Sequence, residues 1–234
     1  MAKNKSQASK PDVLEEGNEK LSNAFLNAEY FFEQYRNVIL GVIAAFIIGI
    51  GGWWSYNNFV KAPGERKAKD AIISAQKYFE TDSVMLALKG DGKSLGFEAI
   101  AKQYGGTAAG NRAKFAAGVC NLKLGNYAEA IKFLEDSEPD DAILNARKFG
   151  CIADAYAEQN QMDKAIDNYK KAAEAANNEL TAPTYLYRAA LALEQKGNKK
   201  EALELYKKVV AEYPNSQEGM ASQMYVAKLE AQTF

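Results

Sequence analysis

The sequence contains no histidine and only two cysteines. Without histidine, the Ser-His-Asp and Cys-His nucleophile arrangements, the two-histidine zinc motifs and a histidine general base are excluded. Cys120 and Cys151 do not have the spacing of a metal-binding motif. Both fall in apolar helical patterns, so we expect buried free thiols, with one disulfide as the alternative in an oxidising compartment.

Neither sign of charge is in excess. The chain has 29 Lys and Arg against 30 Asp and Glu, and we find no basic stripe of the kind that nucleic-acid-binding proteins carry. We therefore expect no nucleic-acid partner. We also expect no cofactor, no metal, no small-molecule substrate and no enzymatic activity, because the sequence offers no constellation of residues for them.

Two short segments contain residues that serve catalysis in other proteins. KGDGKS (89–94) includes Gly-Lys-Ser, but it lacks the first glycine and the preceding strand of a phosphate loop, so it predicts a turn. Four acidic residues surround Pro139: Asp136, Glu138, Asp140 and Asp141. In a loop between helices they predict helix caps and a solvated edge rather than a paired-carboxylate site.

By contrast, residues 37–60 form a run of 24 residues without a charge. As a helix, the run would be ~36 Å long, enough to cross the ~30 Å hydrocarbon core of a bilayer. We therefore predict a transmembrane helix over 37–60. Its membrane-anchoring residues are Val38, Ile39, Leu40, Ile43, Phe46, Ile47, Ile50, Trp53 and Trp54. The alternatives are a cleaved signal peptide, which has a shorter apolar core nearer the start of a chain, and a buried core helix.

The segments on either side of the run differ in character. Residues 1–20 are polar and predict a disordered tail. Residues 21–36 have apolar side chains near helical spacing and predict an amphipathic juxtamembrane helix, which either rests on lipid headgroups or docks onto a membrane partner. Pro63-Gly64 predicts that the helix is interrupted there and that a separate folded unit follows. The Lys and Arg residues near the run leave its orientation open.

Three later stretches, 118–134, 153–172 and 190–209, repeat one pattern. A small residue is followed by a turn residue seven positions later, an alanine after five more and a large apolar residue after four more. The residues are Gly118, Ala153 and Ala190, then Gly125, Asn160 and Gly197, then Ala130, Ala165 and Ala202, then Leu134, Tyr169 and Tyr206. The pattern resembles the tetratricopeptide repeat, a helix–turn–helix unit of ~34 residues. We expect the small residues where the helices of a repeat cross.

The predicted fold is all-α, with a single N-terminal transmembrane helix followed by a right-handed solenoid of tetratricopeptide repeats. Residues 61–110 would be a degenerate helical repeat, 111–214 three repeats and 215–234 a capping helix. Helices are expected at 65–80, 83–88, 97–104, 108–123, 126–136, 141–159, 162–175, 183–196, 199–212 and 216–230. No strand pattern stands out.

The resemblance implies that the first helix of each repeat lines a concave groove with its second, fifth, ninth and twelfth positions. The groove residues are then Arg112, Phe115, Val119 and Leu122, followed by Arg147, Gly150, Asp154 and Ala157, and by Thr184, Tyr187, Leu191 and Glu194. Such a mixture of arginine, aromatic and apolar side chains suits a protein partner. The alternative is that these faces pack against the N-terminal helices. Phe115 and Val119 replace the Lys and Asn clamp of one subfamily, which argues against a cytosolic chaperone tail as the partner.

The layout from about residue 20 onward resembles the ancillary subunit of the bacterial Sec translocon. Two stretches in particular resemble Bacteroidetes-type members: YFETDS (78–83) and LKGDGKSLGFEAIAKQYGGTAAGNRAKFAAGVCNLKLGNYAEAI (88–131). The resemblance implies a single-pass protein of the bacterial inner membrane, with a cytoplasmic N-terminus and a periplasmic repeat domain. Its partners would be the lipid bilayer and translocon subunits, a periplasmic chaperone or nascent secreted chains. The alternative is a scaffold for another envelope-assembly complex.

Overall fold

The computed structural model describes residues 12–232, with side chains from Phe31 onward except those of Phe32 and Val60. The chain divides into two compact units between Phe59 and Val60. We describe each unit by itself.

The first unit consists of one long helix, α1 (Asp12–Tyr56). It covers the predicted juxtamembrane helix and most of the predicted span in one piece. The helix begins at Asp12, so the prediction of a disordered tail over residues 1–20 is wrong from that residue on, while residues 1–11 lie outside the described part of the chain. Residues 12–20 contain three glutamates, one leucine and one lysine, and these residues favour a helix once a longer one continues from them.

The prediction that the helix is interrupted at Pro63-Gly64 is also wrong. Asn57–Lys61 form a π-helical turn, and α2 (Ala62–Glu80) includes both Pro63 and Gly64 in its first turn. Proline is tolerated there because the first turn of an α-helix does not use all its N–H groups.

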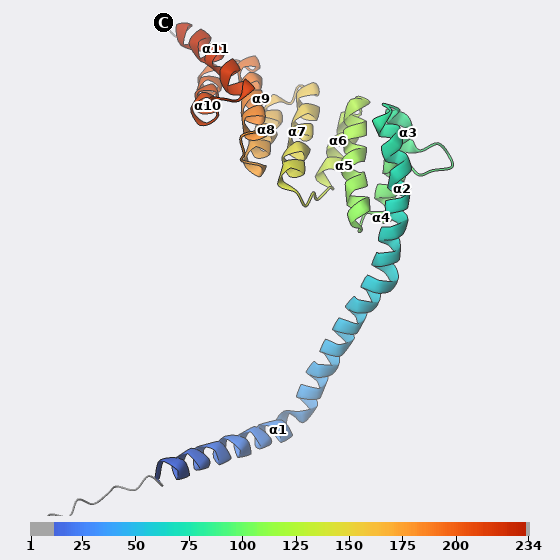
Figure 1. Ribbon diagram of the computed structural model, residues 1–234, viewed down its shortest axis with the longest axis vertical. Helices are drawn as coiled ribbons and strands as arrows, with labels where there is room; N and C mark the ends of the chain where they lie inside the picture. Colours follow the sequence, from blue (N-terminus) through green and yellow to red (C-terminus); the bar gives the residue numbers. More distant parts are fainter. Residues whose placement is uncertain (1–11, 233–234) are drawn as a thin grey trace, which may run out of the picture. The chain divides into compact units, whose positions relative to one another are not determined.

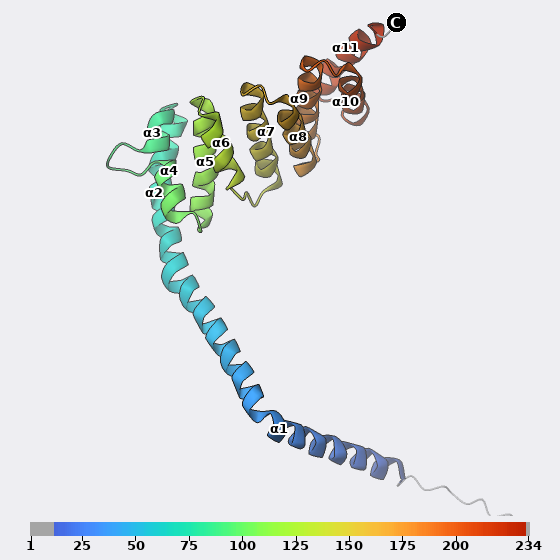
Figure 2. The same cartoon turned by 180° about the vertical axis from the view of Figure 1, so that it is seen from behind.

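The second unit contains only helices and loops in its described part, apart from an isolated bridge between Gly90 and Leu95. The helices after α2 are α3 (Val84–Lys89), α4 (Phe97–Tyr104), α5 (Ala108–Lys123), α6 (Tyr127–Glu135), α7 (Ala142–Glu158), α8 (Met162–Ala175), α9 (Ala182–Gln195), α10 (Lys199–Glu212) and α11 (Gln217–Ala231). Each expected helix is confirmed to within three residues at either end. Figures 1 and 2 show α5 to α11 following one another along the unit as stacked helical hairpins.

Small residues lie where the two helices of each repeat cross, as predicted. Ala130, Ala153, Ala165, Ala190 and Ala202 are fully buried. At Gly118, the remaining small position, an added Cβ would lie 2.5 Å from Cγ of Leu134. The close approach of the helices therefore depends on the absence of larger side chains at these positions.

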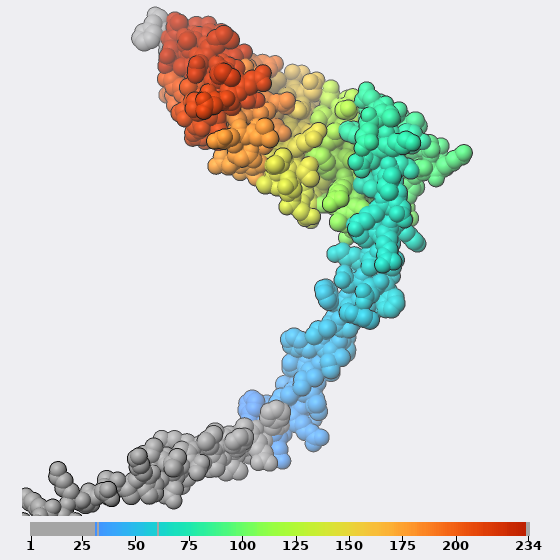
Figure 3. Space-filling model, viewed as in Figure 1, coloured from blue at the N-terminus to red at the C-terminus, as the bar shows by residue number. Residues whose placement is uncertain are grey.

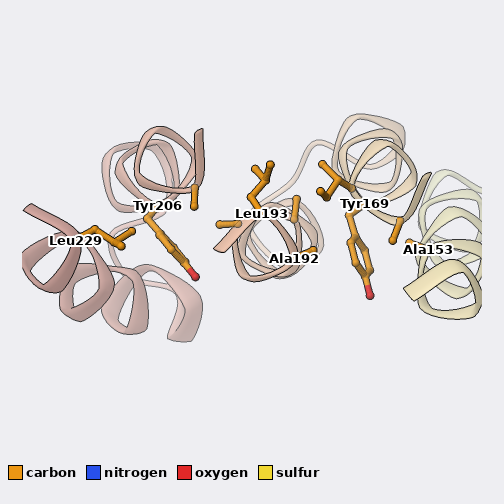
Figure 4. Close-up of a cluster of buried hydrophobic side chains, with 11 residues drawn as sticks. Ala153, Tyr169, Ala192, Leu193, Tyr206 and Leu229 are labelled. Atoms are coloured by element: carbon orange, nitrogen blue, oxygen red, sulfur yellow. The ribbon is translucent and has the colours of Figure 1, made fainter. Parts of the chain in front are cut away.

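The large residue at the end of the pattern fills the space between neighbouring helices. Leu134 and Tyr206 are fully buried, and Tyr169 is nearly so. Figure 4 shows Tyr169 beside Ala153 and Tyr206 beside Leu229 in one apolar cluster that spans α7 to α11. The second and third repeats thus share one core cluster, as neighbouring units of a solenoid do.

The turn residue of each repeat has a left-handed backbone conformation. The φ angles of Gly125, Asn160 and Gly197 are 77°, 58° and 88°. Glycine and asparagine adopt this region most readily, and one such residue ends the first helix of a hairpin in the way described for helix C-termini. The turn residues of the sequence pattern are therefore a conformational requirement.

A second local motif occurs at both ends of the repeats. Thr107 and Ser216 each cap the helix that follows, accepting the N–H of Gly110 or Gly219 at 2.9 Å. Each hydroxyl also donates to the carbonyl of the tyrosine three residues earlier, Tyr104 at 2.7 Å or Tyr213 at 2.8 Å. The first turn of α5 and of α11 therefore lies directly on the end of the preceding helix.

Two loops behave as their sequences predict. Asp141 caps α7, since its carboxylate accepts the N–H groups of Ile143 and Leu144 at 2.9 Å each. Asp91 accepts the N–H groups of Lys93 and Ser94 in the glycine-rich turn, which stands out beside α3 in Figure 3. The N–H of Ser94 and the hydroxyl of Tyr78 lower the pKa of Asp91 to about 2. Both segments are thus turn and cap structures.

Candidate functional site

The predicted groove residues lie on α5, α7 and α9, and they differ widely in exposure. Arg112 and Arg147 are exposed, and Val119 is only 9% exposed. The others are half-buried: Phe115, Leu122, Asp154, Ala157, Thr184, Tyr187, Leu191 and Glu194. Gly150 is buried. The structure therefore leaves only part of the predicted surface free for a partner.

In the first repeat, the apolar positions face the core. Val119 packs with Ile131, Leu134 and Ile152, and Phe115 and Leu122 lie against the same cluster. Phe79 of α2 contributes to it as well, with Lys123 above its ring at 5.0 Å. The alternative that the N-terminal helices cover these positions thus holds for Val119, whose side chain stabilises the fold and is not accessible.

In the second repeat, side chains of the next helix occupy the face. A Cβ at Gly150 would lie 2.2 Å from the ring of Tyr185, so this ring fills the space above the glycine. Asp154 accepts a hydrogen bond from the hydroxyl of Tyr169 at 2.5 Å and from Arg188 at 2.9 and 3.1 Å. Burial and the bond to Asp154 raise the pKa of Tyr169. The carboxylate predicted to meet a partner is therefore bonded within the protein and ties α7 to α8 and α9.

In the third repeat, tyrosines form the face. Tyr206 stacks on Tyr225 at 4.8 Å between ring centroids, and Tyr187 lies 5.8 Å from both. Glu194 accepts from Tyr206 at 3.3 Å and from Lys228 at 2.7 Å. Burial, followed by the hydrogen bond with Tyr225, raises the pKa of Tyr187 to about 12. Sequence analysis missed this tyrosine cluster because it joins α9, α10 and α11.

A small cavity remains open beside the exposed part of the groove. It has a volume of about 140 Å³ and lies between the start of α5 and the loop that leads into α7. Its lining consists of Ala108, Asn111, Arg112, Phe115, Pro139, Asp140, Asp141 and Leu144. Arg112 forms no ion pair with any residue in the described chain, so its guanidinium is available to a partner.

Apolar side chains adjoin this cavity and were not among the predicted site residues. Ile143 and Leu144 are 50% and 40% exposed at the start of α7. They lie in the first turn of α7, after the capping Asp141 and Ala142. An apolar pair at the start of a helix, next to an acidic loop, is the signal by which the sequence could have drawn attention to them. Leu144 lines the cavity together with Phe115 and Arg112, and Ile143 is its exposed neighbour on α7.

The two cysteines are free thiols, as expected, with Cys120 buried and Cys151 half-buried. Burial raises the pKa of each from 9.0 to about 11, and the nearby carboxylate of Asp154 raises that of Cys151 further. Since the folded state favours the protonated thiols, this contribution to stability is complete below pH ~9 and is lost as the pH rises toward ~11.

The rate of alkylation should reveal the raised pKa of Cys151 in the folded protein. At pH 8, we expect iodoacetamide to modify Cys151 about 100-fold more slowly in the folded protein than in denaturant, because a pKa raised by two units reduces the thiolate about 100-fold. Mass spectrometry of peptides that contain Cys151 would measure the rate. Equal rates in the two states would contradict the burial of this thiol.

The residues searched in the described chain contain no group of three or more His, Cys, Asp or Glu side chains placed to hold a metal ion. Asp136, one of the four loop acids, forms an ion pair with Lys114 at 2.8 Å, and Asp141 is a helix cap. The acidic loop is thus used for local structure.

The comparisons with known proteins agree with this architecture. The model of the tetratricopeptide repeat family matches residues 97–142 and 152–217. Two crystal structures of nearly identical TPR-like repeats, from a Podosopora anserina protein described as a kinesin light chain, are similar in fold. A point variant has a TM-score of 0.53 at 17% identity, over 70% of this chain and 84% of that one. The other has a TM-score of 0.52 at 16% identity, over 70% and 85%.

No curated protein matches the chain. At these identities the solved structures establish the fold alone, and the family model covers all but residues 143–151 of the region 111–214 in which the sequence pattern predicts three repeats. Tetratricopeptide folds are typical of protein–protein interaction modules, which are usually not enzymes. The second unit is therefore an all-α, TPR-like solenoid that matches the tetratricopeptide repeat over residues 97–142 and 152–217.

Proposed function

We propose that this protein is anchored in a membrane by α1 and that its solenoid binds a protein partner at one face of the bilayer. One observation carries the membrane part. Within the helical segment Glu33–Glu80, an 18-residue window has a mean hydropathy of 2.0, and none of it is buried inside the described structure. By length and composition this segment is a candidate span.

Exposure of this segment to water would be unfavourable. Phe46, Ile47, Ile48 and Ile50 are each more than 60% exposed in the isolated helix. Burying such a side chain gives about 1.5–3 kcal/mol, so the segment gains much from lipid. A core helix would bury these side chains against other helices, and within residues 12–232 the structure offers none that cover them. Lipid is the surrounding that suits the segment best.

The partner surface is best supported at Arg112, Phe115 and Leu144. The cavity between them combines the unpaired cation of Arg112 and the carboxylates of Asp140 and Asp141 with aromatic and aliphatic side chains. A polypeptide with an apolar side chain beside a hydrogen-bond acceptor for Arg112 would fit it. Arginine and aromatic residues are also enriched among the residues that dominate binding energies at protein interfaces.

The finer proposal follows the resemblance in layout. We propose that the anchor lies in a bacterial inner membrane with the solenoid in the periplasm. There the solenoid would associate with the Sec translocon and contact translocating chains or a periplasmic chaperone. The scaffold of another envelope-assembly complex is the second possibility, and one experiment distinguishes the two.

The experiment determines orientation and neighbours together. A single thiol would be placed at Lys200→Cys in a Cys120→Ser, Cys151→Ser background, since Lys200 is exposed at the start of α10. A membrane-impermeant maleimide is expected to label it in cells whose outer membrane alone is permeabilised. Crosslinking in the same cells is expected to recover translocon subunits with wild type, and fewer of them with Arg112→Glu, Leu144→Asp.

Each part of the proposal has its own contrary outcome. Labelling only after inner-membrane lysis would place the solenoid in the cytoplasm. Crosslinks to other envelope proteins, without translocon subunits, would favour the scaffold. Equal recovery with the Arg112→Glu, Leu144→Asp variant would remove the cavity from the partner surface. Lys132→Glu, Ala128→Asp, which makes the same change of charge on exposed residues of α6, is the control for an effect of charge alone.

A further inference from the structure

A second and larger cavity lies apart from the one beside Arg112. It has a volume of about 390 Å³ and is formed by α8, the start of α9 and α10. Its lining consists of Lys170, Ala173, Glu174, Asn177, Ala182, Leu186, Leu205, Lys208, Glu212 and Tyr213. The volume falls in the range of about 300–1,000 Å³ that is usual for ligand sites. We refer to it as the α8–α10 cavity.

The floor of the α8–α10 cavity is apolar and firmly packed. Ala173, Ala182 and Leu186 are buried in a cluster with Val209, and Leu205 and Tyr213 pack against that cluster. The hydroxyl of Tyr213 donates a hydrogen bond to Asn177 at 2.8 Å, which fixes the tyrosine ring at the edge of the cavity. The floor therefore presents aliphatic and aromatic surface that is already ordered before anything binds.

Carboxylates dominate the rim. Glu174 and Glu212 line the α8–α10 cavity, and Glu179 lines an adjoining one of about 150 Å³ that shares Glu212 and Tyr213 with it. None of these three carboxylates forms an ion pair with a residue in the described part of the chain. They are close enough to act on Tyr213, whose pKa is raised by burial and then by Glu212 and Glu179.

The cations at the same rim do not cancel this charge. Lys170 is already held by Glu201 at 2.6 Å. Lys208 is exposed and has no ion-pair partner among residues 12–232. In the lining of the α8–α10 cavity, one free ammonium thus stands against the two free carboxylates of Glu174 and Glu212, and Glu179 in the adjoining cavity adds a third, so the rim attracts positive charge.

We propose that the α8–α10 cavity binds a lysine or arginine side chain of a protein partner. The aliphatic stem would lie on Leu186 and Leu205, the cationic head would reach Glu174 and Glu212, and the ring of Tyr213 would face the cation. Partners would carry such a residue beside a small or apolar one. The site is separate from the one around Arg112, and it needs neither the membrane location nor the translocon.

Two labelled peptides test the proposal against the full chain in non-ionic detergent. One is a 12-residue Gly-Ser peptide that contains Leu-Arg-Leu, and the other contains Leu-Glu-Leu in its place. Fluorescence anisotropy is expected to show saturable binding of the arginine peptide, at least tenfold tighter than that of the glutamate peptide. Because the micelles are the same in all samples, differences between protein variants report on the protein.

The variants locate the binding. Glu174→Gln, Glu212→Gln is expected to weaken the arginine peptide at least tenfold. The control Glu129→Gln, Glu135→Gln makes the same change of charge on exposed residues of α6 and should alter binding less than twofold. Arg112→Glu, Leu144→Asp should leave this binding unchanged, since these residues line the other cavity.

Several results would overturn the proposal. The proposal fails if the arginine peptide does not bind saturably, or if the two peptides bind equally well. It also fails if Glu174→Gln, Glu212→Gln binds the arginine peptide as tightly as wild type, or if the α6 control loses as much affinity. Loss of binding in Arg112→Glu, Leu144→Asp alone would place the peptide at the cavity beside α5. The failure of the membrane or translocon proposal would affect none of these measurements.

Discussion

Replacing Gly110 by alanine is expected to destabilise the solenoid by about 3 kcal/mol, while Gly106→Ala, four residues earlier, should change stability by less than about 0.5 kcal/mol. A Cβ at Gly110 would lie 1.8 Å from the carbonyl oxygen of Tyr104 and 2.3 Å from its carbon. Both are backbone atoms at the end of α4 and cannot rotate away. At Gly106, an added Cβ would meet nothing within 4 Å.

The stability loss is expected because two elements must separate to admit one methyl group. Thr107 holds the same two segments together, accepting from Gly110 and donating to Tyr104. Any shift of α5 away from α4 would lengthen these bonds and open the cluster that contains Phe97, Ile100 and Cys120. The upper part of the range for overpacked cores, about 1–3 kcal/mol, therefore applies.

Cys120 offers a direct measurement of this effect. It is fully buried on α5, so its alkylation requires the solenoid to open. In a urea series we expect the midpoint of Cys120 alkylation to fall for Gly110→Ala and to stay near wild type for Gly106→Ala. Gly219→Ala should behave like Gly110→Ala in a global unfolding measurement, since its Cβ would lie 2.0 Å from the carbonyl oxygen of Tyr213. A Gly110→Ala protein as stable as Gly106→Ala would show that the contact can relax.

The repeat architecture could be predicted from the sequence because its requirements are local. Gly118, Gly125 and Ala130 lie within one helical hairpin, and each has a simple physical reason. Two positions admit only small side chains between crossing helices, and one needs a positive φ. When such a set recurs in three consecutive hairpins, the helix boundaries follow from the turns, which is why they were predicted closely.

The candidate site was harder to predict because its residues depend on neighbours that are distant in the sequence. Val119 is inaccessible partly because Phe79 of α2 packs on its cluster. Asp154 is unavailable because Arg188 and Tyr169 reach it from α9 and α8. The rule that certain helix positions line a groove describes an average repeat, and it cannot include these side chains. Arg112 stays exposed and forms no ion pair with a described residue, whereas Phe115 is half-buried against the same cluster as Val119 and keeps only part of its surface free.

The errors at the N-terminal side have a different cause. A polar composition predicted disorder up to residue 20, but helix propensity extends α1 to Asp12 once a long helix exists. At Pro63, the sequence signals a break only if the proline lies inside a regular helix. The π-turn Asn57–Lys61 places it in a first turn instead, where its missing N–H has no cost. The polar composition of residues 1–20 and the proline at position 63 are genuine signals, but the neighbouring helix changes their effect.

The second large effect concerns the anchor. Replacing both Ile43 and Ile47 by lysine is expected to release the full chain from membranes, because each lysine near the centre of a span costs about 3 kcal/mol and the pair about 6 kcal/mol. The two residues lie one turn apart on α1. Wild type should stay in the membrane pellet after alkaline carbonate extraction, and Ile43→Lys, Ile47→Lys should move to the supernatant.

Matched variants separate this effect from a folding defect. Ile43→Leu, Ile47→Leu keeps the apolar surface and should remain in the pellet. Cys120 alkylation should be as slow in Ile43→Lys, Ile47→Lys as in wild type, because the buried core of the solenoid includes no residue of α1 in the described structure. Fast alkylation in the lysine variant would mean that the two units do not fold independently.

The wild-type result decides among the readings of the apolar run. Retention in the pellet at the full mass of 25.7 kDa is expected for an uncleaved span. A shorter chain that begins near Trp54 would identify the run as a removed signal sequence. Extraction of the full-length wild type would mean that protein, not lipid, covers Phe46, Ile47 and Ile50. In that case the partner would have to bury this helix, and the membrane proposal would be withdrawn in favour of a binding surface along α1.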